Sequence, residues 1–191
     1  MEKKLKLLKK FKKENIKFKG LTGCLKKKVT PPPEVYERIK RENKIIANAR
    51  AIESDLTFFK KKFINPIDKA IVTGVYGSQR ILNGKPKWPH YGIDFAAKEG
   101  TKIKAMLDGT ATMVEPDLFY TGGTLIFDHG HGISTLYMHM QKINVKKGQK
   151  VKQGDIIGSV GSTGRSTGPH LDVRLNWFGT RLDPATVFDL N

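Results

Sequence analysis

The side chains of this chain that could do chemistry together are histidines and aspartates in its second half. His90 stands four residues before Asp94, and His170 stands two residues before Asp172. Between these pairs, His139 ends a short apolar run. Neutral imidazole nitrogen and carboxylate oxygen are ligands that zinc prefers, and a catalytic zinc keeps one coordination position open. The spacing therefore indicates a mononuclear metal centre with three ligands and two histidines left to handle protons.

Two further histidines have a plainer interpretation. His129 and His131 alternate with Gly130 and Gly132 between two apolar runs. Although they are two residues apart and could bind a metal, flanking glycines are typical of a tight turn. We therefore expect both to be residues of a hairpin turn near the surface.

Short strands are the elements that must position the chemistry. After residue 69 the chain changes to β-branched and aromatic runs separated by glycine, a pattern typical of strands and turns. Side chains two or four positions apart in a strand point to the same face, so both His–Asp pairs can converge on one point. We expect a mainly β fold, a compact antiparallel sheet folded over a groove. The expected strands are 72–76, 101–105, 110–114, 124–127, 134–138 and 155–159.

The region before this sheet has a helical pattern. Between residues 34 and 62, apolar side chains recur mostly at steps of three and four, which predicts one long amphipathic helix packed outside the sheet. The chain thus divides into a lysine-rich arm at 1–33, which could be the remnant of an N-terminal domain, a helical linker at 34–62 and a β-rich domain at 63–191. The apolar positions of the helix are Val35, Ile39, Ile45, Ile46, Ala49, Ile52, Leu56 and Phe59.

Positive charge is concentrated at the start of the chain. The formal net charge is +17, and residues 1–33 hold twelve lysines against two glutamates. Such a block attracts anionic polymers, but it is equally typical of a solvated arm. Lysine without arginine or interleaved aromatic residues is a weak nucleic-acid signal, so we expect no nucleic-acid partner. No run approaches the roughly 18 apolar residues of a membrane span, and no export signal is visible.

Three ordered motifs carry a resemblance to a known family. His90 with Asp94, the run 137–139 and the run 167–171 resemble the lysostaphin-type (LytM-like) zinc metallopeptidases, which cut peptide bonds in peptidoglycan. The match extends over roughly 63–188 in the family's order and spacing. The resemblance implies a LytM-like fold in which His90 and Asp94 bind one Zn²⁺ per chain. It also implies that the residues matching His139 and His170 are catalytic and lie beside the metal without binding it.

The chain departs from the family at one metal-binding position. The family's last motif is usually His-x-His, and its second histidine is the third zinc ligand, whereas Asp172 stands here. Arg174 follows at a position where the family often has an acidic residue. In one interpretation Asp172 is the third ligand, giving a site of one histidine and two aspartates that zinc accepts. In the other, Asp172 is paired with Arg174, which shares its face of the strand, and metal binding is weakened or lost.

The sequence favours a zinc endopeptidase that acts on stem or cross-link peptides of peptidoglycan. One of His139 and His170 would take a proton from water, and the other would donate to the developing oxyanion. Because of Asp172, the alternative is an inactive relative that binds the cell wall and recruits or activates another hydrolase. A nucleic-acid-binding protein dependent on the lysine arm is the third hypothesis. Peptidoglycan as partner places the chain in the periplasm or cell envelope, which indicates a truncated start or another export route.

Overall fold

A computed structural model describes residues 20–21, 26–69 and 71–187. Most of the predicted arm at 1–33 lies outside these ranges. The helices are α2 (Lys26–Val29) and α3 (Tyr36–Arg50), with 3-10 turns at Pro33–Val35, Phe58–Lys60 and Pro184–Thr186. The strands are β1 (Gly20–Leu21), β2 (Ile71–Gly74), β3 (Ile81–Leu82), β4 (Lys85–Pro86), β5 (Ile93–Ala96), β6 (Lys102–Lys104), β7 (Gly109–Leu118), β8 (Gly122–Asp128), β9 (Ile133–Ile143), β10 (Lys150–Val151), β11 (Ile156–Val160), β12 (His170–Trp177) and β13 (Thr180–Leu182).

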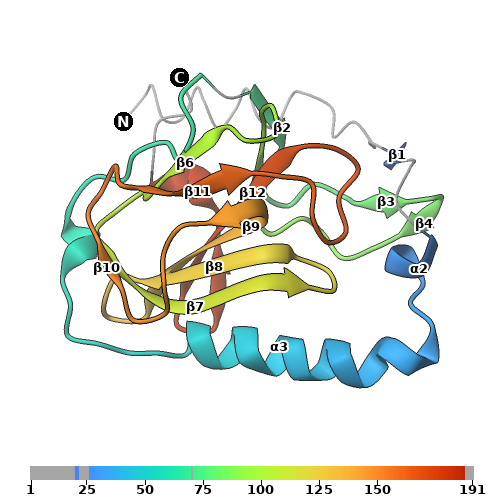
Figure 1. Cartoon of the computed structure of the whole chain (residues 1–191), viewed down its shortest axis with the longest axis horizontal. Helices are drawn as coiled ribbons and strands as arrows, with labels where there is room; N and C mark the ends of the chain where they lie inside the picture. Colours follow the sequence, from blue (N-terminus) through green and yellow to red (C-terminus); the bar gives the residue numbers. More distant parts are fainter. Residues whose placement is uncertain (1–19, 22–25, 70, 188–191) are drawn as a thin grey trace.

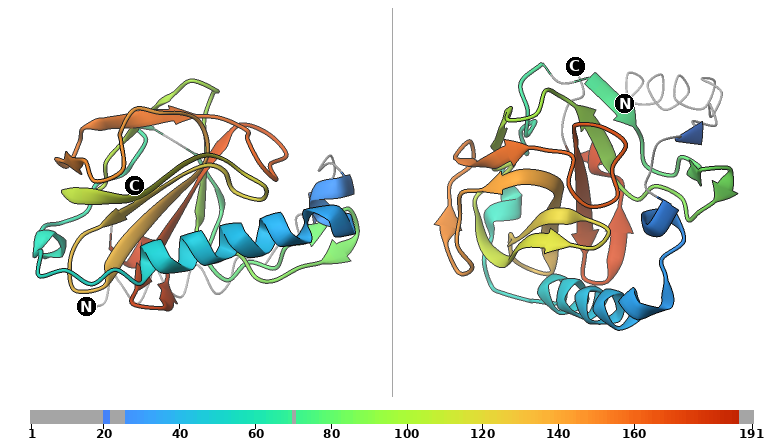
Figure 2. Two further views of the ribbon diagram at one scale, coloured as in Figure 1. Left: turned by 60° about the horizontal axis from the view of Figure 1, so that its bottom comes forward. Right: turned by 45° about the vertical axis from the view of Figure 1, so that its right-hand side comes forward.

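One large antiparallel sheet forms the body of the molecule, as predicted. Its strands follow the order β10-β7-β8-β9-β12-β5-β2, and β11 pairs with both β9 and β6. The sheet is strongly curved in both views of Figure 2. Each of the six predicted strands corresponds to an observed one, within a few residues at either end. The sequence predicted neither the full length of β12 nor the strand β13 that follows it.

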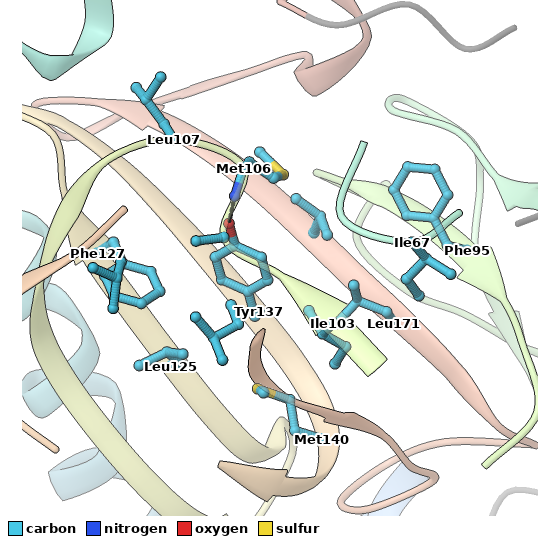
Figure 3. Close-up of a cluster of buried hydrophobic side chains, with 14 of the residues drawn as sticks. Ile67, Phe95, Ile103, Met106, Leu107, Leu125, Phe127, Tyr137, Met140 and Leu171 are labelled. Carbon is cyan, nitrogen blue, oxygen red and sulfur yellow. Dashed lines mark hydrogen bonds between the residues drawn. The ribbon is translucent and has the colours of Figure 1, made fainter. Parts of the chain in front are cut away.

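The main hydrophobic core lies inside the curve of the sheet. Fully buried aliphatic and aromatic side chains from β5, β6, β8, β9 and β12 meet there (Figure 3). Tyr137 is buried at its centre, and its hydroxyl accepts a hydrogen bond from the Met106 N–H at 2.9 Å. A buried hydroxyl without a partner would destabilise the core by about 1–3 kcal/mol, so this bond lets a polar aromatic occupy a core position.

The predicted amphipathic helix is present but shorter than expected. α3 lies along the outer side of the sheet below β7 and β8 (Figure 1), where Ile45, Ile46 and Ala49 pack on buried residues of the sheet. The prediction that it continues to residue 62 was wrong, because the helix ends at Arg50. Beyond it the chain crosses the β8–β9 turn, where Ser54 Oγ donates to an Asp128 carboxylate oxygen at 2.6 Å. These contacts between distant residues replace further helical turns.

A second, smaller sheet flanks one end of the molecule. β1 pairs with β3 in parallel, and β3 forms a hairpin with β4. Val29 of α2 and Leu82 of β3 are buried together, so α2 and the hairpin support each other beyond the end of α3 (Figure 1). Lys26, Lys27 and Lys28 therefore belong to a helical turn within the lysine-rich arm. Within the described ranges, no helix is both long and apolar enough to cross a bilayer.

Gly130 is expected to be indispensable for the contact between the segment after α3 and the β8–β9 turn. Its φ is +96°, and a Cβ there would lie 1.6 Å from the Leu56 carbonyl oxygen. Gly130→Ala should lower the free energy of unfolding by more than about 2 kcal/mol, since backbone strain and overpacking act together. The matched control is Gly148→Ala, because Gly148 has a φ of +84° but open space around its Cβ position. Equal losses for both variants in urea unfolding would contradict the proposed clash.

Candidate metal centre and catalytic groove

Three buried side chains converge on one point, two from neighbouring strands and one from the segment before β5. Asp94 of β5 and Asp172 of β12 are direct cross-strand neighbours. His90 Nε2 lies 3.1 Å from Asp94 Oδ1 and 3.2 Å from Asp172 Oδ2. One potential ligand atom from each residue lies within 4.8 Å of the other two. The structure thus brings together all three residues that the sequence nominated as metal ligands.

His90 reaches this point by a bend rather than by strand alternation. β5 begins only at Ile93, so the expectation that His90 and Asp94 share one extended segment was wrong. Gly92 makes the bend possible, because a Cβ there would lie 2.5 Å from both Asp172 Oδ1 and the Val173 carbonyl oxygen. The backbone before β5 therefore passes close against β12. Asp172 follows the prediction, since it lies two residues after His170 on β12.

Each aspartate also contacts an arginine. Arg80 Nη2 donates to Asp94 Oδ2. Arg174 donates to both oxygens of Asp172, with distances of 3.3 Å from Nε and 3.0 Å from Nη2. The structure therefore contains the contact expected from each interpretation of Asp172. Its carboxylate faces His90, as a metal ligand would, and it is also paired with Arg174.

These contacts determine the charges in the centre. Although burial opposes ionisation of Asp172, Arg174 and His90 hold its pKa well below the usual range. Burial opposes ionisation of Asp94 as well, but its hydrogen bond with His90 keeps the pKa of this carboxyl low. Burial disfavours the imidazolium form of His90, yet the two carboxylates raise the pKa of His90. Two buried carboxylates thus attract positive charge to the space between them and His90.

The donor set fits a divalent cation such as zinc. His90 Nδ1 lies 3.3 Å from the Val75 carbonyl oxygen, so its N–H donates there and the Nε2 lone pair faces the aspartates. When Nε2 is deprotonated, Asp94 Oδ1, which is buried and lies 3.1 Å from it, has no hydrogen-bond partner among the described residues. A lone pair, an orphaned carboxylate oxygen and a second carboxylate directed at one space form a stable arrangement only around a cation or proton.

Two further histidines face the same groove. The rings of His139 and His170 lie 4.7 Å apart between centroids. His139 Nδ1 lies 2.8 Å from the Thr163 carbonyl oxygen, and His170 Nδ1 lies 2.7 Å from that of Gly168. Since a carbonyl only accepts, each neutral ring carries its proton on Nδ1. Each Nε2 is then a proton acceptor, and it becomes a donor only when its ring is protonated.

The side chain of His139 is directed into the groove by an irregularity in β9. Met138 lies opposite Asp172 on β12, so strict alternation would point His139 to the other face of the sheet. His139 has a φ of +63°, and the pairing of β8 with β9 shifts register in this region. Such bulges redirect side chains and are frequent beside active sites. Burial, together with the neighbouring His170, lowers the pKa of His139 to about 4, so the ring is neutral at neutral pH.

A groove of about 470 Å³ opens over these residues. Its floor holds His90, Asp94, Asp172, His139 and His170. The β3–β4 hairpin and the segment after it, the β7–β8 turn and the loop at 165–169 also line it. A single groove with these five side chains at its base can hold an extended substrate against a metal centre.

Two features of the site could not be seen in the sequence pattern. Arg80 precedes the first motif, but no local signal shows that it contacts Asp94 fourteen residues later. The prediction that His129 lies near the surface was wrong, because this residue is completely buried. Its ring contacts the Asp108 carbonyl and the Thr135 hydroxyl at 2.7 and 2.8 Å, and burial lowers its pKa to about 4. His131 is exposed as expected.

Residues 88–184 match the model of peptidase family M23. This range holds all five side chains on the floor of the groove. The chain belongs to peptidase family M23. The predicted family, the mainly β fold and the metallopeptidase class are thereby confirmed.

Solved structures and curated relatives agree with this assignment. The chain is similar to a zinc-containing peptidase from Vibrio cholerae, with a TM-score of 0.60 and 35% identity over 64% of this chain and 39% of that one. It is also similar to the catalytic domain of lysostaphin from Staphylococcus simulans, with a TM-score of 0.55 and 34% identity over 62% and 92% of the two chains. The peptidoglycan DD-endopeptidase ShyA of Vibrio cholerae is 46% identical over 46% of this chain and 20% of its own length. The matches span 20% to 30% of the first curated relatives.

Proposed function

We propose that this M23 peptidase is a zinc-dependent endopeptidase that hydrolyses peptide bonds in the stem or cross-link peptides of peptidoglycan. The observation that carries the proposal is the convergence of His90, Asp94 and Asp172 beside His139 and His170 in one groove. The similarity to ShyA and lysostaphin supports the substrate class. Peptidoglycan as substrate places the protein in the cell envelope.

The metal site in this proposal consists of His90, Asp94 and Asp172. Zinc bound there would supply a Lewis acid that polarises water and the scissile carbonyl. Arg80 and Arg174 hold the aspartates in the orientation that faces His90, a role that such neighbours of metal ligands commonly have. The same arginines offset the negative charge that a second carboxylate brings to the site.

His139 is the general base in this proposal, and His170 is the electrophilic partner. His139 is buried and neutral, and its Nε2 is the nitrogen left to accept a proton from water. His170 is more accessible, and as an imidazolium it donates from Nε2 to the oxyanion that forms at the scissile carbonyl. The bond each Nδ1 makes with a backbone carbonyl fixes both rings in position before substrate arrives.

Removal of the metal tests this function directly. The purified protein is expected to contain about one zinc per chain and to release cross-link peptides from peptidoglycan. A chelator should abolish release, and added Zn²⁺ should restore it, because the proposed chemistry needs the Lewis acid. Mass spectrometry of the released peptides and elemental analysis of the protein provide the two measurements.

An inactive wall-binding protein is the second candidate, because both aspartates already have arginine partners. Zinc far below one per chain, together with unchanged cross-links in treated peptidoglycan, would favour this candidate. Retention on peptidoglycan with no peptide release, in protein shown to contain full zinc, would also contradict the endopeptidase.

A further inference from the structure

Trp88 is an exposed aromatic side chain on the wall of the groove. The residue is 81% exposed, the highest value for a large apolar residue in the described part of the chain. It lines the groove and lies two residues before His90 in the sequence. No ring of the described residues stacks on it. An indole exposed in this way leaves apolar surface in water beside the candidate catalytic centre.

The backbone on either side of Trp88 is held firmly. The Lys87 N–H donates to the Arg80 carbonyl at 2.8 Å, and the His90 N–H donates to that of Ser78 at 2.9 Å. The Lys87 ammonium also donates to the Val29 carbonyl of α2 at 2.9 Å. Between these anchors, Pro89 has a fixed φ and restricts the backbone of Trp88 to extended conformations. The exposed ring is therefore carried on a fixed piece of backbone, which reduces the entropy lost when a ligand stacks on it.

The other aromatic rings of the groove are covered by cations. The Arg165 guanidinium lies over the Tyr120 ring at 4.6 Å, and the Arg181 guanidinium lies over the Tyr91 ring at 4.3 Å. These surfaces are positively charged and suit the carboxylates of a peptide. Trp88 is the groove aromatic whose face has no such cover among the described residues, so its chemistry differs from theirs.

We propose that Trp88 is a sugar-binding residue that stacks on a pyranose ring of the peptidoglycan glycan next to the peptide being cut. This inference rests on the proposed function and adds the glycan to the recognised substrate. A pyranose presents an apolar C–H face bordered by hydroxyl groups, and an exposed indole offers a matching flat surface with a polar N–H at its edge. The floor of the groove then positions the peptide bond, while Trp88 binds the carbohydrate at the rim.

The test compares substrates with and without sugar. Wild type, Trp88→Ala and Trp88→Phe are assayed on cross-linked muropeptide dimers and on the same cross-linked peptides after an amidase has removed the sugars. Trp88→Ala should raise KM for the sugar-bearing dimers about three- to tenfold and leave kcat unchanged. Its KM for the sugar-free peptides should equal that of the wild type. Trp88→Phe should recover most of the loss, because it keeps a flat ring.

Trp177→Ala is the matched control. Trp177 is also exposed, at 52%, but it lies at the end of β12 and does not line the groove. This variant should match the wild type on both substrates. Equal losses for Trp88→Ala on both substrates would show that Trp88 contacts peptide, and no loss on either would show that substrate does not reach it. Either result overturns the proposal.

A binding measurement separates this inference from the proposed function. Glycan strands freed of peptides are titrated into each protein by calorimetry. Binding by the wild type that is lost in Trp88→Ala supports the sugar site, even in a protein that cuts neither substrate. Absence of hydrolysis on both substrates contradicts the endopeptidase. Equal binding of glycan strands by wild type and Trp88→Ala, or by neither, overturns the sugar site.

Discussion

Asp172→Ala is expected to lose bound zinc and, with it, all measurable hydrolysis of peptidoglycan. Asp172 offers one of three candidate ligand atoms, and its carboxylate lies 3.2 Å from His90 Nε2. Mutation of a residue that only orients a metal ligand typically lowers metal affinity by about 10- to 100-fold. Loss of a ligand itself should therefore weaken zinc binding by more than about 100-fold. Elemental analysis after dialysis and competition with a chromogenic chelator measure the effect.

The partnership with Arg174 makes a second variant necessary. Asp172→Ala leaves the Arg174 guanidinium without the carboxylate that it contacts through Nε and Nη2, so the variant should also be less stable. The double variant Asp172→Ala/Arg174→Ala removes both charges and should recover thermal stability without recovering zinc. Asp172→His keeps a ligand atom at the position and should retain metal. Stoichiometric zinc in Asp172→Ala would refute Asp172 as a ligand.

The residues of the candidate metal centre were predictable because their local signals are strong. Two His–Asp pairs and the apolar run ending at His139 stand in segments whose composition is typical of strands and turns. The alternation rule placed His170 and Asp172 on one face of β12. The same rule gave a wrong path for His90, since Gly92 bends the chain where a regular strand was expected. A bend that depends on close packing against Val173 cannot be read from spacing.

Other features depend on contacts between residues far apart in the chain. α3 ends at Arg50, shortly before Ser54 contacts Asp128, which lies 74 residues further along the chain, although helical periodicity continues in the sequence. His129 has glycine as its following neighbour, but Phe63 packs edge-on against its ring at 6.0 Å and buries it. The turn was predicted correctly, and the burial was not. Local pattern predicts element type, whereas burial and element ends depend on tertiary neighbours.

His139 could be nominated from the sequence, but the bulge that positions its side chain could not be predicted. Regular alternation along β9 would have directed His139 away from Asp172, and nothing in its neighbours' composition indicates a φ of +63°. The end of an apolar run nominated the residue, and the resemblance to the lysostaphin-type enzymes added its catalytic role. The structure adds the physical cause of its position and the bond with the Thr163 carbonyl that fixes its tautomer.

His139→Ala is expected to lower kcat by about 10²- to 10⁴-fold, the usual contribution of a positioned general base. Zinc content should remain at the wild-type level, because His139 is not among the three residues whose ligand atoms converge. KM should change little, since the proton is transferred only during reaction. The measurement is steady-state hydrolysis of cross-linked muropeptide dimers, with zinc determined on the same preparations.

Rescue by added imidazole distinguishes a base from a structural histidine at this position. Truncation of a buried ring leaves a space beside the groove, and a free imidazole there can accept the proton that His139 Nε2 would take. Part of the lost kcat should return as imidazole is added, and only in His139→Ala. His129→Ala is the matched control, because His129 is also buried and also has a pKa of about 4, yet it does not line the groove. That variant should lose stability but keep kcat. Full activity in His139→Ala, or loss of zinc along with activity, would contradict the role of His139 as the base.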